Sequence, residues 1–149
     1  MNTRYGMEIR AATSAEAPGL CDLLAAAGHV IPVRILAERL DAIRQGASTA
    51  LVALEWGPPS GLVVLHWYHT LDAAQPTAQI TTLLVGPDDR RRGIGRLLVK
   101  AAAQAARVAG CGDLELSATV AQPALHDFCR ATGFTEAGPR FVRALRKKG

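Results

Sequence analysis

Hydrophobic and polar positions change period along the chain, and these changes divide it into short elements. Leucine and isoleucine recur at helical spacing in residues 20–27 and 33–44, and a glycine follows each run. This spacing predicts two short helices, the first with Thr13 or Ser14 as its N-cap. Weak alternation in residues 7–11 predicts a strand before them. We therefore expect the chain to begin with one strand followed by two helices.

Three predicted strands follow, joined by short links. Residues 48–56, 61–71 and 79–85 are rich in β-branched and apolar side chains, which favour strands. The links, residues 57–60 and 72–76, contain proline with glycine or aspartate and are predicted to be turns. Because consecutive strands with short connections pair antiparallel, we expect a meander.

The last third of the chain alternates helical and strand patterns. Residues 93–109 are amphipathic, and residues 122–131 form a shorter helical segment. Strands are predicted at residues 114–118, 134–137 and 141–145. The strands before and after the long helix should be parallel, with a right-handed crossover. The whole pattern predicts an α/β fold with a mixed, mostly antiparallel sheet of about seven strands, a parallel central pair and about four flanking helices.

One junction in this pattern is a candidate binding site. After the strand at residues 79–85 the chain turns at Gly86-Pro87-Asp88, passes three arginines, and reaches Gly93 and Gly95 at the start of the long helix. Glycines allow the backbone to approach a ligand closely. The first N–H groups of a helix have no partner within it and lie at the positive end of its dipole. Together these features predict a site for a phosphate group.

Two common phosphate-binding loops do not fit this junction. A dinucleotide fingerprint requires a third glycine, and Leu98 occupies its place. A Walker loop requires Gly-Lys-Ser/Thr, which is absent here. What remains is Arg90-x-x-Gly93-x-Gly95, which resembles the acetyl-CoA signature Gln/Arg-x-x-Gly-x-Gly/Ala of the GNAT N-acetyltransferase superfamily. The order of the predicted elements is also that of the GNAT fold.

A second match lies near the C-terminus. Phe128, Gly133 and Phe134 stand where the superfamily commonly has phenylalanine, glycine and phenylalanine. Gln122 occupies the position of the usual asparagine, and Cys129 that of the usual tyrosine. The resemblance therefore covers nearly the whole chain and departs from the superfamily pattern at two positions.

The resemblance implies an N-acetyltransferase that uses acetyl-CoA as its acyl donor, by direct attack in a ternary complex. The implied acceptor is a primary amine of a small molecule (an aminoglycoside, an amino acid or a polyamine) or of a protein N-terminus. The end of the strand would contact pantetheine through its backbone, and the loop and helix start would hold the pyrophosphate. The implied cofactor-binding residues are Leu83, Leu84, Val85, Arg90, Arg91, Arg92, Gly93, Ile94, Gly95, Arg96 and Gln122.

Two residues are the candidate catalytic groups. The superfamily tyrosine often protonates the departing thiolate, and the thiol of Cys129 could do so because its ordinary pKa, about 8.5, is close to that of the leaving group. Packing is the alternative role for Cys129. His66 is the candidate base, since its ordinary pKa suits proton transfer near neutral pH. His69, Glu115 and a chain of water to solvent are the alternatives.

The acceptor is expected between the first two helices and the meander, with residues 29–34 and 66–72 as walls. Arg34 would favour an acceptor that carries a carboxylate, and Asp72 a cationic one. A second function remains open, a non-catalytic acyl-CoA-binding or sensing module. It is motivated by Cys129 and by the lack of a carboxylate in the strand at residues 79–85.

Composition and charge narrow the class of protein. Apolar residues make up 49% and charged residues 20% of the 149 positions, which fits one folded domain over 1–149. The absence of a long apolar run and of a signal-peptide pattern predicts a cytoplasmic protein with no membrane partner.

The basic excess and the cysteines add little further chemistry. A polyphosphate cofactor explains the net charge of +4, and no aromatic residues interleave with the basic C-terminal end, so we expect no nucleic-acid partner. The three cysteines have no paired spacing, which predicts neither a disulfide framework nor a metal site. A homodimer is left open.

Overall fold

A computed structural model of the chain describes residues 2–4, 6–89, 93–117, 123–138 and 140–146. The chain divides into two compact units, Met1–Ser117 and Ala118–Gly149. Of the described residues, the first unit holds those of the sheet, and the second holds one short helix and the segment after it. The assignment of one domain to 1–149 stays a prediction.

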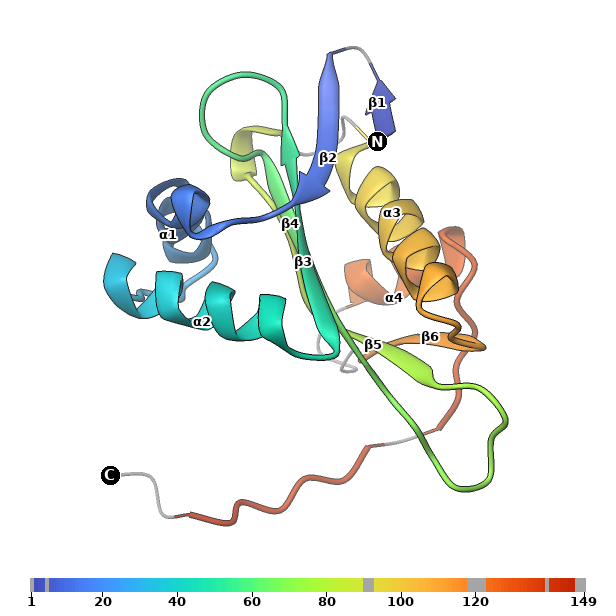
Figure 1. The fold of residues 1–149 in the computed structure, drawn as a ribbon. Coiled ribbons are helices and arrows are strands. Elements are labelled where there is room, and N and C mark those ends of the chain that lie inside the picture. Colours follow the sequence, from blue (N-terminus) through green and yellow to red (C-terminus); the bar gives the residue numbers. More distant parts are fainter. Residues whose placement is uncertain (1, 5, 90–92, 118–122, 139, 147–149) are drawn as a thin grey trace. The chain divides into compact units, whose positions relative to one another are not determined.

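The first unit is built on one mixed sheet, which has six strands in the described chain, ordered as they are in the sequence (Figure 1). The strands are β1 (Asn2–Arg4), β2 (Met7–Ala11), β3 (Ser48–Leu54), β4 (Gly61–Tyr68), β5 (Thr77–Val85) and β6 (Asp113–Leu116). Neighbours from β1 to β5 are antiparallel, which confirms the predicted meander. β5 and β6 are parallel, as expected for a strand–helix–strand unit.

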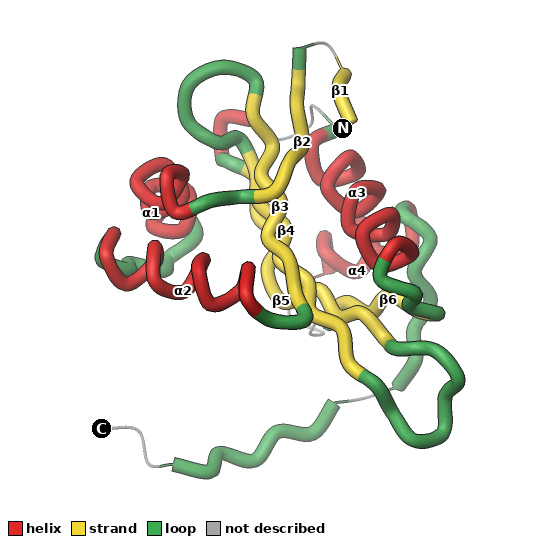
Figure 2. The backbone as a smooth tube through the Cα atoms, in the orientation of Figure 1, coloured by secondary structure: helices red, strands yellow, loops and turns green. Residues whose placement is uncertain are grey.

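Helices of the first unit cover both faces of the sheet. α1 (Ala17–Ala26) and α2 (Val33–Gln45) lie on one face, and α3 (Ile94–Val108) lies on the other (Figures 1 and 2). Short 3-10 turns, Ser14–Glu16 and Pro87–Asp89, precede α1 and follow β5. These helices confirm the three that the apolar spacing predicts for this part of the chain.

The core beneath α1 and α2 follows the apolar period of the sequence. Leu20, Leu36 and Leu40 are buried on the inner sides of the two helices. They pack in one cluster with Val52 of β3 and Leu62 of β4. Complete burial of a side chain of this size contributes about 1.5 to 3 kcal/mol. The helical spacing of leucine is therefore sufficient to fix which side of each helix meets the sheet.

The sheet differs from prediction at its C-terminal strands. Residues 134–137 and 141–145, predicted as strands, have no regular secondary structure among the described residues. Phe141, Val142 and Leu145 are 91%, 75% and 90% exposed, so these side chains bury no apolar face that would stabilise a strand. The described sheet consequently has six strands instead of about seven, and its parallel pair lies at an edge instead of at the centre.

β1 is a strand that the sequence pattern does not predict. It has 3 residues, too few for a period to be recognised, and it pairs with β2 in an antiparallel ladder. Gly6 lies between the two strands with φ of +82°, a backbone conformation that glycine adopts without strain. The turn at Gly6, and not an alternation of apolar residues, therefore accounts for the formation of this hairpin.

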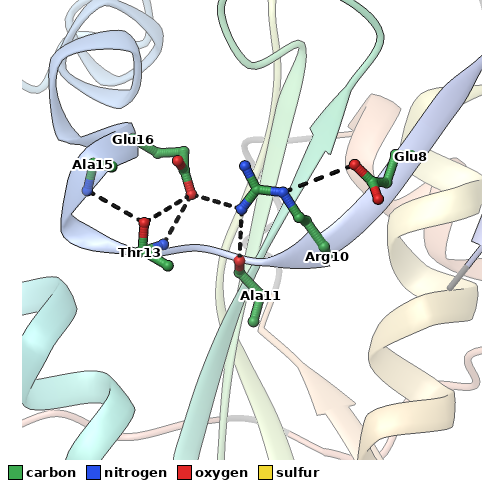
Figure 3. A network of polar contacts seen from close by, with 6 residues as sticks. All are labelled: Glu8, Arg10, Ala11, Thr13, Ala15 and Glu16. Carbon is green, nitrogen blue, oxygen red and sulfur yellow. Dashed lines mark hydrogen bonds and ion pairs between the residues drawn. The ribbon is translucent and has the colours of Figure 1, made fainter.

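A polar network fastens the end of β2 to the start of α1 (Figure 3). The hydroxyl of Thr13 accepts from the Ala15 N–H at 3.3 Å, and the Thr13 N–H donates to Glu16 Oε1 at 2.9 Å, forming a capping box. Arg10 of β2 donates to the same Glu16 oxygen at 2.8 Å. The Glu16 side chain is only 12% exposed, so these donors, more than solvent, stabilise its negative charge.

Glu16→Gln should lower the free energy of unfolding by about 1 kcal/mol at pH 7, because it removes the carboxylate that Arg10 and Thr13 share. The hydrogen bond from Arg10 lowers the pKa of Glu16 below its ordinary value, although partial burial opposes this. The stabilisation is therefore present above the unfolded carboxyl pKa of about 4.3 and is lost as pH falls through the lower folded value. Urea denaturation should show a larger difference from wild type at pH 7 than at pH 3.

Glu8→Gln is the matched control. Glu8 Oε1 lies 3.8 Å from Arg10 Nε and both side chains are 36% exposed, so solvent screens this pair and its loss should cost less. An equal loss of stability in the two variants would contradict the role given to Glu16.

Candidate functional site

The end of β5 has one open edge. β6 pairs with β5 only from Thr77 to Ile80, where Ile80 lies beside Leu116. From Thr81 to Val85 the strand has β4 on one side and, among the described residues, no strand on the other. We call the point after Ile80 and Leu116 the β5–β6 fork. Backbone donors and acceptors of an open edge can bind an extended ligand in the manner of an added strand.

An extra residue interrupts β5 at the same place. Val64 of β4 pairs with Thr82 and the next residue, Leu65, pairs with Ile80, so Thr81 has no partner on β4. Such a bulge bends the strand and re-aims its side chains. The bulge and the fork therefore coincide at the first residue of the open edge.

The start of α3 lies in sequence directly after the loop that follows β5. Gly93 is the N-cap of α3 with φ of +79° and ψ of 12°, the left-handed region that glycine adopts most readily. The Leu97 N–H donates to the Gly93 carbonyl at 3.1 Å, which is the usual first bond of a helix. The N–H groups of Ile94 and Gly95 come before that bond and have no acceptor within the helix. Ile94 as a whole is 2% exposed, so its side chain belongs to the core and is not available to a ligand.

A glycine in β4, Gly61, allows the start of α3 to pack closely on the sheet. A Cβ added to Gly61 would lie 2.9 Å from Leu98 Cδ1, 3.1 Å from Ile94 Cγ2 and 3.0 Å from the Leu84 carbonyl oxygen. The first turns of α3 thus pack directly on β4, next to the end of β5. The contact brings the helix start and the open edge of β5 together.

A small cavity of about 140 Å³ borders the same edge. It is lined by Leu23, Ala26, Ala27, Leu83, Leu84, Val85 and Pro87. The structure therefore brings three of the expected cofactor-binding residues, Leu83, Leu84 and Val85, to one cavity beneath the end of α1. Arg90, Arg91, Arg92 and Gln122 lie outside the described residues, and Arg96 is exposed on α3.

Polar side chains gather on one face of the sheet beside the fork. His66, Gln79 and Glu115 are cross-strand neighbours on β4, β5 and β6. The next row holds Tyr68, Thr77 and Asp113. His66 and Tyr68 follow Leu62 and Val64 at a period of two, and those residues belong to the core beneath α1 and α2, so both rows share that face. We call these six residues the polar face.

Two hydrogen bonds order the polar face. His66 Nε2 lies 3.1 Å from Thr81 Oγ1, and which of the two donates depends on the histidine tautomer. The Tyr68 hydroxyl donates to Glu115 Oε1 at 3.1 Å, across the intervening β5. Partial burial raises the pKa of Tyr68, and the hydrogen bond to Glu115 and its negative charge raise it further. The tyrosine therefore keeps its proton and remains a donor at neutral pH.

Tyr68 is a residue of this face that the sequence analysis does not name, although its place two residues after His66 puts it on the same face of a strand. Glu115 is one of the alternative bases, and its register with Gln79 places it on the same face of the sheet as His66. His69, the other histidine considered, follows the last residue of β4 and is exposed.

Cys129 belongs to the second unit, in α4 (Pro123–Ala131). Its side chain is half-buried, and burial raises the pKa of the thiol while the neighbouring Arg130 opposes the rise. The Phe134 N–H donates to the Cys129 carbonyl at 2.9 Å, and Gly133 has φ of +97°, so the helix ends at a left-handed glycine. The thiol is protonated at neutral pH, as a proton donor must be.

A larger cavity, about 490 Å³, lies on the α3 side of the sheet. Its lining residues are Ile9, Thr49, Leu51, Trp67, Ala101, Gln104, Ala105, Val108 and Ala109. None of these side chains titrates near neutral pH, so the cavity offers no acid or base. The chemistry of the unit is therefore concentrated on the polar face and at the fork.

The described residues contain no group of three or more His, Cys, Asp or Glu side chains placed to hold a metal ion. Within the same part of the chain, every helix is too short or too polar to cross a bilayer.

Comparison with known proteins gives consistent matches. The model of the acetyltransferase (GNAT) family matches residues 20–134. An aminoalkylphosphonate N-acetyltransferase of Salmonella typhimurium is 33% identical over 94 residues, which are 63% of this chain and 61% of that protein. The match thus spans about three fifths of that relative's length.

Solved structures extend the likeness over most of the chain. A protein from Agrobacterium tumefaciens, described as an acetyltransferase, is 28% identical and matches 92% of this chain and 99% of its own with a TM-score of 0.83. An aminoglycoside acetyltransferase from a soil metagenome, solved with sisomicin, is 20% identical and matches 95% of this chain and 97% of its own with a TM-score of 0.78. At that identity the second match supports the fold alone.

Proposed function

Because the chain belongs to the acetyltransferase (GNAT) family, we propose that it transfers the acetyl group of acetyl-CoA to a primary amine, by direct attack in a ternary complex. The family match over residues 20–134 supports the reaction class. The acceptor we propose is a small-molecule amine: an aminoglycoside, an amino acid, a polyamine or an amine like that of the aminoalkylphosphonate enzyme. A protein N-terminus is the remaining acceptor class.

The observation that carries the proposal is the open edge of β5 beside the left-handed Gly93. Residues Thr81–Val85 offer strand-like backbone groups that suit the amides of pantetheine. The N–H groups at the start of α3 suit the pyrophosphate, and Gly93 leaves space there, since an added Cβ would meet no atom within 4 Å. The described residues therefore fit coenzyme A, and Arg90, Arg91, Arg92, Arg96 and Gln122 are proposed to add contacts.

A thioester supplies an acyl group that is already activated, so the chain has to position the amine and move protons. We propose that His66, which lies on the polar face beside the fork, is the general base and accepts a proton from the reacting amine. We propose that Cys129 is the general acid, and that its protonated thiol donates a proton to the departing thiolate. Glu115 shares the cross-strand row of His66, and its role is developed below.

The reaction is tested by thiol release from acetyl-CoA over a panel of amines. The panel holds 2-aminoethylphosphonate, sisomicin, an amino acid, 1,4-diaminobutane and a peptide with a free N-terminus. Release above the rate without amine is expected for at least one member. Coenzyme A binding without release on any amine would instead favour the non-catalytic acyl-CoA-binding module.

Gly93→Asp should weaken coenzyme A binding by at least about tenfold, because a carboxylate at the positive end of α3 repels the pyrophosphate and occupies its place. Gly93→Asn is the control, since asparagine is of the same size and tolerates the left-handed conformation but carries no charge. Titration calorimetry with coenzyme A compares the two. Equal affinity of the Asp and Asn variants would contradict binding of the pyrophosphate at this helix start.

Cys129→Ala should lower kcat by about tenfold or more if the thiol is the general acid, since acid catalysis contributes about 10² to 10⁴ in rate. Cys111→Ala is the control, because this thiol is also half-buried and also has a pKa raised by burial. The measurement is kcat at saturating amine, with thermal unfolding to compare stability. Unchanged kcat in Cys129→Ala would assign the residue to packing.

A further inference from the structure

One carboxylate of the polar face, that of Glu115, lies at the β5–β6 fork. Glu115 lies one residue before Leu116, the last residue of β6 that pairs with β5. Its cross-strand neighbour Gln79 is uncharged, and no residue of the polar face carries a permanent positive charge. Glu115 therefore has no cationic partner on this face, and its carboxylate is available to a ligand.

The Tyr68 hydroxyl limits the freedom of that carboxylate. An exposed glutamate loses side-chain conformational entropy when it is held in one rotamer. The hydrogen bond from Tyr68 to Glu115 Oε1, at 3.1 Å, supplies part of that ordering before a ligand arrives. One carboxylate oxygen is then occupied, and Oε2 remains to accept from a second donor.

Such a carboxylate suits the group that an amine acceptor presents. Aliphatic amines have pKa values near 10, as lysine does, so at neutral pH they arrive as ammonium ions. His66 and Glu115 lie at the two ends of one row with only Gln79 between them, about 10 Å apart by the usual strand spacing. An ammonium group between these side chains would donate to the carboxylate on one side and to the imidazole on the other.

Resting on the proposed function, we propose that Glu115 binds the ammonium group of the acceptor at the β5–β6 fork and that Tyr68 is the positioning residue that orients it. Glu115 then sets the affinity for the acceptor, and His66 takes its proton. Tyr68 acts only through the carboxylate that it holds.

Titration calorimetry and kinetics on single and double variants test the pair. With coenzyme A present, 1,4-diaminobutane and 2-aminoethylphosphonate serve as binding probes. Glu115→Gln should weaken the binding of an amine by about tenfold, because it removes a charge-assisted hydrogen bond. Tyr68→Phe should weaken it by about threefold, and the double variant should be no weaker than Glu115→Gln alone, since residues that act as a unit are not additive.

Two controls separate this role from a structural one. Asp113→Asn removes the other carboxylate of the polar face from the same strand and should leave amine affinity within about twofold. His66→Gln should lower kcat by about 100-fold with little change in KM, whereas Glu115→Gln should raise KM with little change in kcat. Thermal unfolding of each variant verifies that its fold is intact.

Several results would overturn the proposal. Unchanged affinity in Glu115→Gln would remove its binding role, and a loss of kcat at constant KM would make it the proton acceptor instead. Full additivity of the two variants would show that Tyr68 does not act through Glu115. Amine affinity and KM that are both unchanged in Glu115→Gln, with acetyl transfer intact in the wild type, overturn this inference alone. A wild-type chain that binds neither probe and transfers acetyl to no amine overturns the proposed function as well.

Discussion

The parallel pairing of β5 with β6 stops at Ile80, and the rest of the site depends on that limit. An unpaired strand edge is normally a hazard, because its backbone groups can pair with another chain. Here five residues, Thr81 to Val85, keep such an edge, and Gly61 lets the start of α3 pack close beside it. Among the described residues, the unpaired edge of the strand and the start of the helix thus lie close together. Both parts of an extended ligand, amide-bearing and phosphate-bearing, find suitable groups there.

The sequence was sufficient for most elements because their signals are local. Glycine and proline between residues 48 and 85 mark the meander, and the apolar period of residues 93–109 marks α3 with Gly93 at its start. The prediction failed where stability depends on neighbours. Phe141 and Val142 are of the β-branched and aromatic types that favour a strand, yet they remain exposed, and no local signal distinguishes the two cases.

The candidate site was predictable only in part, for a related reason. Residues proposed to bind through their backbone can be named from chain position alone, and the three so named, Leu83, Leu84 and Val85, line one cavity. Residues that act through their side chains depend on which face they occupy. The register of β6 beside β5 decides the facing of Glu115, and its partner Tyr68 is 47 residues away in the sequence. Recognition by backbone also tolerates side-chain variation, which agrees with a shared fold at 28% identity.

The bulge at Thr81 gives β5 a property that its neighbours lack. Side chains of a strand alternate, so an additional residue reverses the facing of every position on one side of it unless a bulge absorbs that residue. Here the bulge absorbs Thr81, and Ile80 and Ala78 remain buried while Gln79 and Thr77 remain on the polar face. Deletion of Thr81 would leave Ile80 opposite Leu65 and Gln79 opposite His66, so it would remove the bend and keep the facing of these side chains. A change in chain length is therefore compatible with β5 at this one position, whereas an insertion or deletion elsewhere in the strand would move its buried residues to the opposite face.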